Sequence, residues 1–211
     1  MAKGKFITLE GGEGVGKTTL IRGLTHILAE RGLDVVVTRE PGGTPGAELL
    51  RDLLLNGDVE RWSSRTEALM MYAARVDHIE RRIQPALKRG AWVLCDRFAD
   101  STRAYQGVGG GLAPEELDAL EAFALGGFHA DLTLIVDLDP ATGLERTLER
   151  GEKITRFEKF DAGYHERLRQ AFLDIASASP KRCVVLDGAL PPGSVLEAAI
   201  AAIDKRLSTG R

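Results

Sequence analysis

The sequence predicts an α/β fold in which helices cover both faces of a parallel sheet of five strands. Short apolar runs bounded by turn residues recur five times, which is typical of buried parallel strands. Segments with helical periodicity separate these runs, so strands and helices alternate along the chain. The chain has 211 residues, 44% of them hydrophobic, which is enough for a sizeable core. We therefore expect residues 1–211 to form a single domain.

The expected elements follow one another without an internal repeat or a linker between domains. Strands are predicted at residues 6–9, 35–38, 92–95, 132–136 and 184–186. Helices are predicted at residues 18–31, 47–55, 64–88, 114–124, 141–149, 164–177 and 194–207. Glycine-rich residues 107–111 and charged residues 150–161 are predicted as functional loops, and residues 208–211 as a frayed tail. Ligands are expected at the carboxyl ends of the strands.

Composition and charge argue against several classes of protein. The net charge of -3 and a pI near 5.9 disfavour a surface that holds a nucleic-acid backbone. Cys95 and Cys183 lie far apart without histidines at ligand spacing, so neither a disulfide framework nor a zinc site is expected. No window approaches about 20 consecutive apolar residues, and no signal-type segment is present. We expect a cytoplasmic location and no membrane contact.

A phosphate-binding loop follows the first predicted strand directly. Residues 11–18 fit the pattern Gly-x4-Gly-Lys-Thr and open an apolar helix, which is the context that this P-loop motif requires. Backbone N–H groups and the helix N-terminus would hold the phosphates of ATP, and Lys17 would add a full positive charge. Thr18 can place its hydroxyl on Mg²⁺. A merely structural glycine turn is disfavoured by the four matching positions. The residues expected to bind ATP are Gly11, Gly12, Glu13, Gly14, Val15, Gly16, Lys17, Thr18 and Thr19.

The P-loop by itself does not distinguish among GTPases, motor ATPases and small-molecule kinases, because these classes share the P-loop NTPase fold. A guanine-reading Asn-Lys-x-Asp sequence is absent. The chain is also too short for the additional domains of a motor. A small kinase is therefore favoured.

Charged residues at the ends of the second and third strands indicate a second phosphate-containing substrate. Asp96 emerges from an apolar strand and can organise Mg²⁺ and phosphates. Arg97 and Arg51 can each bind a phosphate through two parallel hydrogen bonds. Each arginine could instead form a surface ion pair, but several cations at one rim of the sheet favour phosphate binding.

The sequence resembles the thymidylate kinase family over nearly its whole length. The motifs that carry the resemblance are residues 9–18, the Thr-Arg-Glu-Pro-Gly-Gly-Thr string at 38–44, Tyr-Ala-Ala-Arg at 72–75, Asp-Arg-Phe at 96–98 and Ala-Tyr-Gln-Gly at 104–107. The resemblance implies an enzyme that transfers the γ-phosphoryl group of ATP to dTMP with Mg²⁺, giving dTDP and ADP for dTTP synthesis. It also implies a homodimer formed through helices in the middle third of the chain.

The resemblance also assigns roles to the residues that match the family's motifs. Glu13 is expected near the 3′-hydroxyl of the sugar, and Arg97 and Arg51 at the phosphate of dTMP. Tyr105 matches the position that crowds the 2′ carbon, which would exclude ribonucleotides. Arg75, Thr102 and Gln106 match the positions that read the edge of thymine. The full set expected to bind dTMP is Glu13, Arg39, Glu40, Pro41, Arg51, Met71, Arg75, Arg97, Thr102, Tyr105 and Gln106.

One position departs from the family's pattern. The family often stacks thymine on a phenylalanine four residues before the arginine that corresponds to Arg75, and here that position is Met71. Methionine can still make a soft contact with a ring. Tyr72 is the alternative, although its side chain should point about 100° around the helix from Met71. Met70 and Met71 fit a place in the core equally well, because apolar residues at helical spacing are more often core than ligand contacts.

A lid is predicted at about residues 150–161. Some members of the family carry a catalytic arginine in the P-loop, but here the position after Glu13 is Gly14. The compensating charges lie in the lid, where Arg150 and Arg156 are candidates for contacting the transferring phosphoryl group, with Arg146 in reserve. Without the P-loop, this mixed-charge run would be interpreted as a solvated loop. The predicted catalytic set is Lys17, Asp96, Arg97, Arg150 and Arg156, with Thr18 and Asp96 at the metal.

Two alternatives remain from the sequence. A kinase for another nucleoside monophosphate or for a deoxynucleoside would share every P-loop argument, and Arg75 with Gln106 would separate it from a thymidylate kinase. A regulatory P-loop switch would bind nucleotide and a protein partner without phosphorylating a small acceptor. The switch has no evident use for Arg97, Tyr105 and Gln106 around a second pocket.

Overall fold

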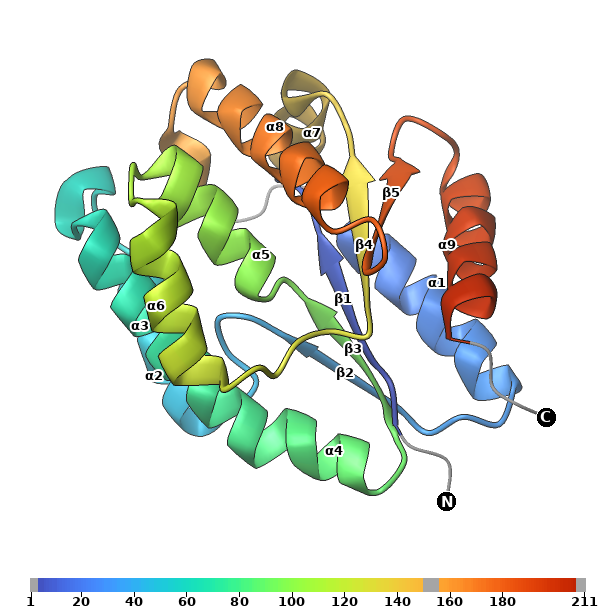
Figure 1. Cartoon of the computed structure of the whole chain (residues 1–211). Coiled ribbons are helices and arrows are strands. Elements are labelled where there is room, and N and C mark those ends of the chain that lie inside the picture. Colours follow the sequence, from blue (N-terminus) through green and yellow to red (C-terminus); the bar gives the residue numbers. More distant parts are fainter. Residues whose placement is uncertain (1–3, 150–155, 208–211) are drawn as a thin grey trace.

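Five parallel strands form one sheet in the computed structural model, which describes residues 4–149 and 156–207. Their order across the sheet is β2-β3-β1-β4-β5 (Figure 1). All five predicted strands are confirmed, and each is longer than expected by one or two residues. The apolar runs end before charged residues that still belong to the ladder. The strands are β1 (Phe6–Glu10), β2 (Val35–Arg39), β3 (Trp92–Asp96), β4 (Leu132–Asp137) and β5 (Cys183–Asp187).

Helices connect the strands and confirm the predicted alternation. The helices are α1 (Lys17–Glu30), α2 (Pro45–Leu55), α3 (Ser64–His78), α4 (Gln84–Lys88), α5 (Ala99–Thr102), α6 (Pro114–Leu125), α7 (Pro140–Glu149), α8 (Ala162–Ala178) and α9 (Pro192–Arg206). Short 3₁₀ turns lie at Val59–Arg61 and Phe157–Lys159. None of the helices in the described part of the chain combines the length and the apolar character needed to cross a membrane.

The helix predicted at 64–88 is interrupted in the structure. A wider π-turn at Ile79–Ile83 separates α3 from α4, and the N–H of Gln84 bonds the carbonyl of Ile79. Pro85 follows immediately, and proline in a helix interior lacks an N–H and clashes with the carbonyl four residues before it. The wider turn thus lies where an ordinary helix would be strained.

A second difference concerns residues 99–111, where the sequence predicts a glycine-rich loop at 107–111. The structure instead continues from α5 into a wide helical turn at Arg103–Gly109. Tyr105 and Gln106 are buried in this turn. Packing against α3 and α8 outweighs the low helix propensity of glycine, and a side chain at Gly109 would meet the Tyr164 ring at 2.8 Å.

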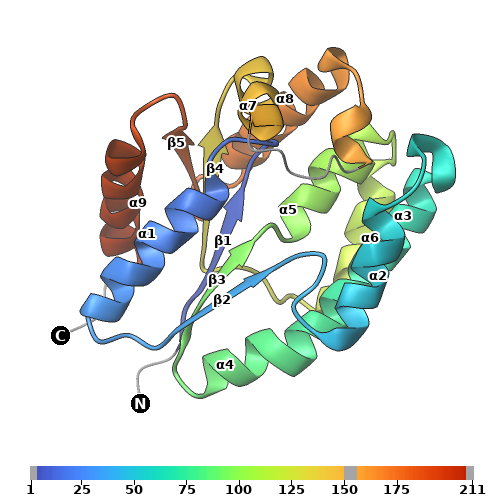
Figure 2. The ribbon, with the colours of Figure 1, turned by 180° about the vertical axis from the view of Figure 1, so that it is seen from behind.

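Helices cover both faces of the sheet, as predicted. One face packs against α1 and α9, whose leucine, isoleucine, valine and alanine side chains share a core with β1 and β4. Figure 2 shows these two helices side by side. The other face packs against α4, α6 and α8. The carboxyl ends of β1, β2 and β3 meet at one edge of the sheet, where the loops that follow them lie close together.

Candidate active site

The P-loop lies between β1 and α1 and holds its lysine against its own backbone. Lys17 Nζ donates to the carbonyl oxygens of Gly11 at 3.2 Å and Gly12 at 2.7 Å. Burial lowers the pKa of Lys17 to about 8, and the neighbouring positive charge of Arg97 acts in the same direction. Thr18 and Thr19 are exposed in the first turn of α1. The cradle therefore offers a cation and a helix N-terminus to an anion.

Gly14 is required by the close approach of another helix. It has a φ of 65°, and a β-carbon built there would collide with the backbone carbonyl of Gly143 in α7. A β-carbon at Gly143 would likewise collide with the carbonyl of Glu13. Two glycines therefore let α7 touch the P-loop backbone to backbone, and neither position has room for a side chain.

Arg97 links the end of β3 to the P-loop. Its Nη1 donates to the carbonyl of Gly11 at 2.9 Å, and its Nη2 donates to Glu13 Oε1 at 2.9 Å. Its guanidinium also lies 5.0 Å from the centre of the Tyr105 ring. Arg97 has a φ of 68°, a left-handed conformation that is uncommon outside glycine. Such strain is typical of functional sites, where the surrounding structure compensates its cost.

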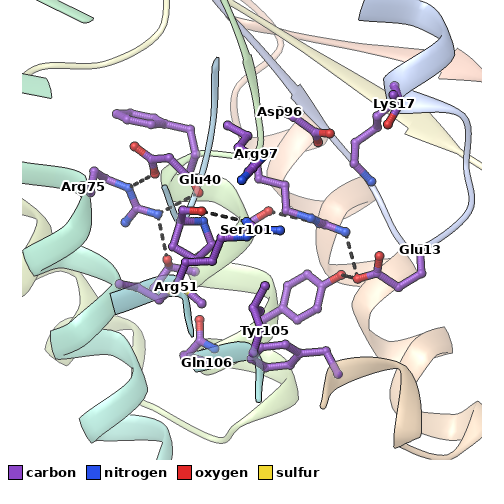
Figure 3. Close-up of a pocket in the computed structure, with 18 of the residues that line it drawn as sticks. Glu13, Lys17, Glu40, Arg51, Arg75, Asp96, Arg97, Ser101, Tyr105 and Gln106 are labelled. Atoms are coloured by element: carbon purple, nitrogen blue, oxygen red, sulfur yellow. Dashed lines mark hydrogen bonds and ion pairs between the residues drawn. The ribbon is translucent and has the colours of Figure 1, made fainter. Parts of the chain in front are cut away.

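Glu13 is the ionised partner of these groups. Burial by itself raises the pKa of Glu13, but the charges of Arg97 and Lys17 outweigh it and lower the pKa to about 2. The Tyr105 hydroxyl donates to Glu13 Oε1 at 2.7 Å and acts in the same direction. Glu13 is therefore a negative charge held beside Arg97, and Figure 3 shows their ion pair with Lys17 nearby.

A cavity of about 250 Å³ opens beside the P-loop. Figure 3 shows its lining side chains, which come from the ends of β2 and β3, from α2 and α3, and from the turn at 103–109. Every residue predicted to bind dTMP lines this cavity: Glu13, Arg39, Glu40, Pro41, Arg51, Met71, Arg75, Arg97, Thr102, Tyr105 and Gln106. The structure thus brings together residues from the P-loop, β2, α2, α3, the end of β3 and residues 102–106.

Arg75 is almost completely buried, and three of its neighbours hold it in place. Its Nε donates to Glu40 Oε2 at 2.6 Å, and its Nη2 donates to the Phe98 carbonyl and to Thr102 Oγ1, each at 3.0 Å. His78, which is fully buried, contacts the other oxygen of Glu40 at 2.9 Å. Within the described chain, Nη1 of Arg75 is buried and has no hydrogen-bond partner. Arg75 therefore presents one unsatisfied donor in a rigid setting.

Gln106 presents the complementary group. Its Nε2 donates to Glu67 Oε2 at 2.9 Å, and its Oε1 is buried without a partner among the described residues. Gln106 lines the same cavity as Arg75. Gln106 thus offers an unsatisfied acceptor in the cavity where Arg75 offers an unsatisfied donor, and a buried polar atom without a partner is rare in folded proteins.

The two arginines at the other end of the cavity differ in exposure. Arg51 is half-buried, and its Nη1 donates to the Pro41 carbonyl at 2.7 Å. Arg39 is exposed and is paired with Glu48 at 3.1 Å. Arg51 and Arg97 both line the cavity beside Lys17. Three cations therefore surround this end of the cavity, which suits a pair of phosphate groups.

Asp96 and Thr18 fit a magnesium ion by their chemistry. Asp96 lies at the carboxyl end of β3 and lines the cavity together with Thr18. Its Oδ1 is buried and lacks a hydrogen-bond partner in the part of the chain that the structure describes. A carboxylate and a hydroxyl are hard oxygen ligands, and Mg²⁺ is commonly held by one or two carboxylates together with substrate phosphates and water.

Among the arginines predicted to contact the transferring phosphoryl group, the two described ones, Arg156 and Arg146, do not line the cavity. Arg150 lies outside the described residues. Arg156 is almost fully buried, and its guanidinium donates to the carbonyls of Leu54 at 3.1 Å and Val59 at 2.7 Å. It also forms an ion pair with Glu67. Arg146 is the reserve candidate, and its Nη1 lies 3.4 Å from the carbonyl of Gly188.

Of Met71 and Tyr72, the two candidates for stacking on the base, only Met71 lines the cavity. Tyr72 is buried behind it with the Arg75 guanidinium 4.6 Å from the centre of its ring. Sequence reasoning gave no role to several residues at the site, most of which lie outside the motifs; only Phe98 belongs to one, the Asp-Arg-Phe string at 96–98. These are Leu55, Phe98, Ser101, Thr147 and Phe157 in the lining, and His78 and Glu67 behind it.

Comparison with known proteins finds similarity to thymidylate kinases over most of the chain. A family model described as thymidylate kinase matches residues 9–199. A thymidylate kinase from Caulobacter vibrioides is 58% identical over 187 residues, which cover 89% of each chain. Thymidylate kinases from Afipia carboxidovorans and Alkalilimnicola ehrlichii are 46% and 44% identical over 209 residues. These alignments cover 98% and 99% of this chain and 92% and 94% of those proteins.

Proposed function

The chain belongs to the thymidylate kinase family, and from this premise we propose how its own residues perform the reaction. It has the P-loop NTPase fold and is an ATP-dependent phosphotransferase that converts dTMP to dTDP. The predictions made from the sequence for family, fold and reaction are confirmed. The roles of individual residues below, the magnesium ion and the dimer are proposals.

The paired donor and acceptor in the cavity are the observation that carries the assignment of the base site. Thymine presents the acceptor O4 next to the donor N3–H. Arg75 Nη1 would donate to O4, and Gln106 Oε1 would accept from N3–H. Cytosine reverses both groups at this edge, so each contact would leave a buried polar atom unpaired. Met71 and Phe98 supply apolar surface for the ring.

Positive charge at the other end of the cavity supports the assignment of the phosphates. Arg51 and Arg97 would hold the phosphate of dTMP, and Lys17 with the P-loop N–H groups would hold the β- and γ-phosphates of ATP. Glu13, ionised at neutral pH, would accept a hydrogen bond from the 3′-hydroxyl of the sugar. The acceptor phosphate is already largely ionised at neutral pH because its second pKa is about 6, so no general base is required.

Magnesium would be held by Thr18 and Asp96, whose oxygen atoms suit it. When bound, the ion neutralises charge on the phosphates of ATP. The protein's own share of the reaction is alignment of donor and acceptor and screening of negative charge by Lys17 and Arg97. Contact of Arg150 with the transferring phosphoryl group stays a prediction, whereas Arg156 pairs with Glu67 outside the cavity.

The test measures ADP release from Mg-ATP with dTMP, dUMP, dCMP, dGMP, dAMP and thymidine offered separately. Wild type should turn over dTMP selectively. Arg75→Ala should lower kcat/KM for dTMP by about 100-fold, because it removes a donor to the base and leaves the buried Glu40 without its guanidinium partner. Gln106→Leu is a second, uncharged variant in case Arg75→Ala does not fold. Arg89→Ala, which removes an exposed arginine paired with Asp34, is the matched control and should act as wild type.

Other outcomes of this experiment would overturn the assignment. Preference for another nucleotide would keep the P-loop kinase and remove the assignment of the thymine edge. ATP binding without turnover on any acceptor would favour a regulatory switch. Selectivity for dTMP in wild type that Arg75→Ala and Gln106→Leu leave unchanged would move base recognition to other residues.

A homodimer, a cytoplasmic location and one domain spanning the chain stay predictions. Large apolar side chains are exposed on α2, α3 and α6. This exposure supports a dimer that forms through the middle third of the chain. Phe123 is 90% exposed, and Leu49 is 70% exposed. Figures 1 and 2 both show these helices side by side, on the far side of the molecule from α9. Exposed apolar side chains on neighbouring helices are typical of protein contacts.

A further inference from the structure

Behind the cavity, Glu67 and Arg156 form a buried polar chain that ends at Gln106. Glu67 lies in the first turn of α3 and is 6% exposed, while Arg156 and Gln106 are each 1% exposed. One carboxylate oxygen of Glu67 accepts from Gln106 Nε2 at 2.9 Å, and the other pairs with Arg156. Neither Glu67 nor Arg156 lines the cavity, so both act on a substrate only through Gln106.

The hydrogen bond between Glu67 and Gln106 determines which way the Gln106 amide points. An ionised carboxylate can only accept hydrogen bonds, so the NH₂ group of Gln106 must face Glu67. The amide oxygen is then turned the other way, which agrees with a buried Oε1 that has no partner among the described residues. A glutamine without such a neighbour could offer either its oxygen or its nitrogen.

Arg156 in turn fixes the carboxylate. The guanidinium of Arg156 donates to the backbone carbonyls of Leu54 and Val59. The backbone N–H of Arg156 donates to the carbonyl of Leu55 at 3.2 Å. The cation therefore cannot move with the side chain of Glu67, and their ion pair holds the carboxylate in one orientation. Arg156 is thus held by the backbone, Glu67 by Arg156, and Gln106 by Glu67.

We propose that Glu67 is a positioning residue for base selection, which holds the Gln106 amide with its oxygen toward the base. This inference rests on the proposed function, in which Gln106 accepts from N3–H of thymine. With its oxygen presented, the enzyme accepts bases that carry an N–H at this edge. It rejects cytosine, whose N3 is an acceptor and would meet Oε1 directly. Selection against dCMP is therefore set partly by residues that do not touch the nucleotide.

Glu67→Gln tests this with almost no change in shape. Arg156 would draw the oxygen of the new amide toward itself, so the new NH₂ group would face Gln106. The Gln106 amide would then turn over and present its nitrogen to the base. KM for dTMP should rise about 10-fold or more with kcat largely retained, because a buried donor now meets N3–H. The ratio of kcat/KM for dTMP to that for dCMP should fall by a similar factor.

The exchange variant Glu67→Gln/Gln106→Glu provides the rescue. The hydrogen bond between positions 67 and 106 is kept with donor and acceptor reversed, and a carboxylate oxygen again faces the base as an acceptor. Discrimination between dTMP and dCMP should recover relative to Glu67→Gln. Glu116→Gln, which removes an exposed carboxylate paired with Arg65, is the matched control and should leave the ratio unchanged.

Equilibrium binding of dTMP and dCMP without ATP, measured by calorimetry, gives a readout independent of turnover. A wild type that does not prefer dTMP to dCMP contradicts the proposed function and this inference with it. A wild type that prefers dTMP, combined with an unchanged ratio in Glu67→Gln, overturns only the role of Glu67. Uniform weakening of all acceptors would show a purely structural role, and so would an exchange variant with no recovery. If Glu67→Gln does not fold, the exchange variant alone decides: loss of dTMP preference overturns the inference.

Discussion

Individual side chains at the site are governed by the balance between burial and neighbouring charge. Lys17 and Arg97 lie close enough that each positive charge disfavours the other, and burial lowers the pKa of Lys17 further. Glu13 offsets part of this repulsion because it is ionised beside both. The phosphate cradle is therefore stabilised by Glu13 and Lys17 of the P-loop together with Arg97 from the end of β3.

The pKa of Lys17 leads to a prediction for ATP binding. Because this pKa is about 8, the free protein should lose the charge of Lys17 as the pH rises through that value. ATP affinity, measured by calorimetry without acceptor, should weaken between pH 7 and pH 9. Lys17→Arg keeps its charge across this range, so its ATP affinity should vary less with pH. An equal pH dependence in both proteins would contradict the assigned titration.

Arg51 and Arg39 give a matched pair for the acceptor phosphate. Arg51 is half-buried and faces the cavity beside Arg97, whereas Arg39 is exposed and paired with Glu48. Arg51→Ala should raise KM for dTMP by about 10- to 100-fold, since a charged hydrogen bond contributes about 1.5–3 kcal/mol. Arg39→Ala should have a much smaller effect. Steady-state kinetics with varied dTMP measure both, and equal effects would argue against Arg51 as the main phosphate ligand.

Among the elements, the contact between α7 and the P-loop determines where the cradle lies. Gly14 and Gly143 approach backbone to backbone, so this helix packs directly against the loop. An arginine at position 14 would displace α7. The glycine at position 14, where some members of the family have an arginine, is therefore matched by the close packing of α7 on the P-loop.

Gly143→Ala tests the importance of this contact. The added methyl group collides with the carbonyl of Glu13, and overpacking of this kind costs about 1–3 kcal/mol. We expect a lower midpoint of thermal unfolding and a higher KM for ATP. Gly193→Ala is the control because a β-carbon at Gly193, in the first turn of α9, meets nothing within 4 Å. Similar behaviour of the two variants would show that the P-loop and α7 can separate without cost.

At the scale of the whole molecule, one buried carboxylate couples stability to pH. Glu10 ends β1 and accepts hydrogen bonds from Phe98 N at 2.7 Å and Ser101 Oγ at 2.6 Å. Burial raises its pKa from 4.5 to about 7, and the charge of Asp100 adds to this increase. The folded protein therefore binds a proton at Glu10 more tightly than the unfolded chain does.

The sign of the effect follows from linkage. Between pH 4.5 and pH 7 the folded state holds more protons at Glu10, so its contribution to stability is present below pH 4.5 and disappears above pH 7. Glu10→Gln does not titrate, so the free energy of unfolding of wild type minus that of Glu10→Gln should fall as pH rises. The fall should be roughly 3 kcal/mol, because a tenfold change in proton affinity corresponds to 1.4 kcal/mol. Urea unfolding at several pH values measures it, and a constant difference would contradict the assignment.

The predicted dimer is also tested at this scale. Phe123 is a large apolar side chain that is 90% exposed on α6. Phe123→Asp should shift the protein from dimer to monomer in analytical ultracentrifugation, because burial of a charge at an interface is unfavourable. Leu190→Asp, on the loop before α9, is the control and should leave the association state unchanged. A monomeric wild type would refute the prediction of a dimer.

Sequence by itself determined the features that depend on neighbouring residues. The P-loop is a local turn, so its residues could be read in order, and the alternation of apolar runs with helical periodicity gave all five strands. The residues that bind the substrate were predicted from the family resemblance, and the structure brought every one of them into one cavity.

Tertiary structure alone decided the arrangement behind the base site, because this arrangement depends on contacts between distant positions. Glu67 meets Gln106 across 39 positions and Arg156 across 89, and no local pattern encodes such pairs. The same reason explains why Arg156, predicted at the phosphates, lies instead behind the base site.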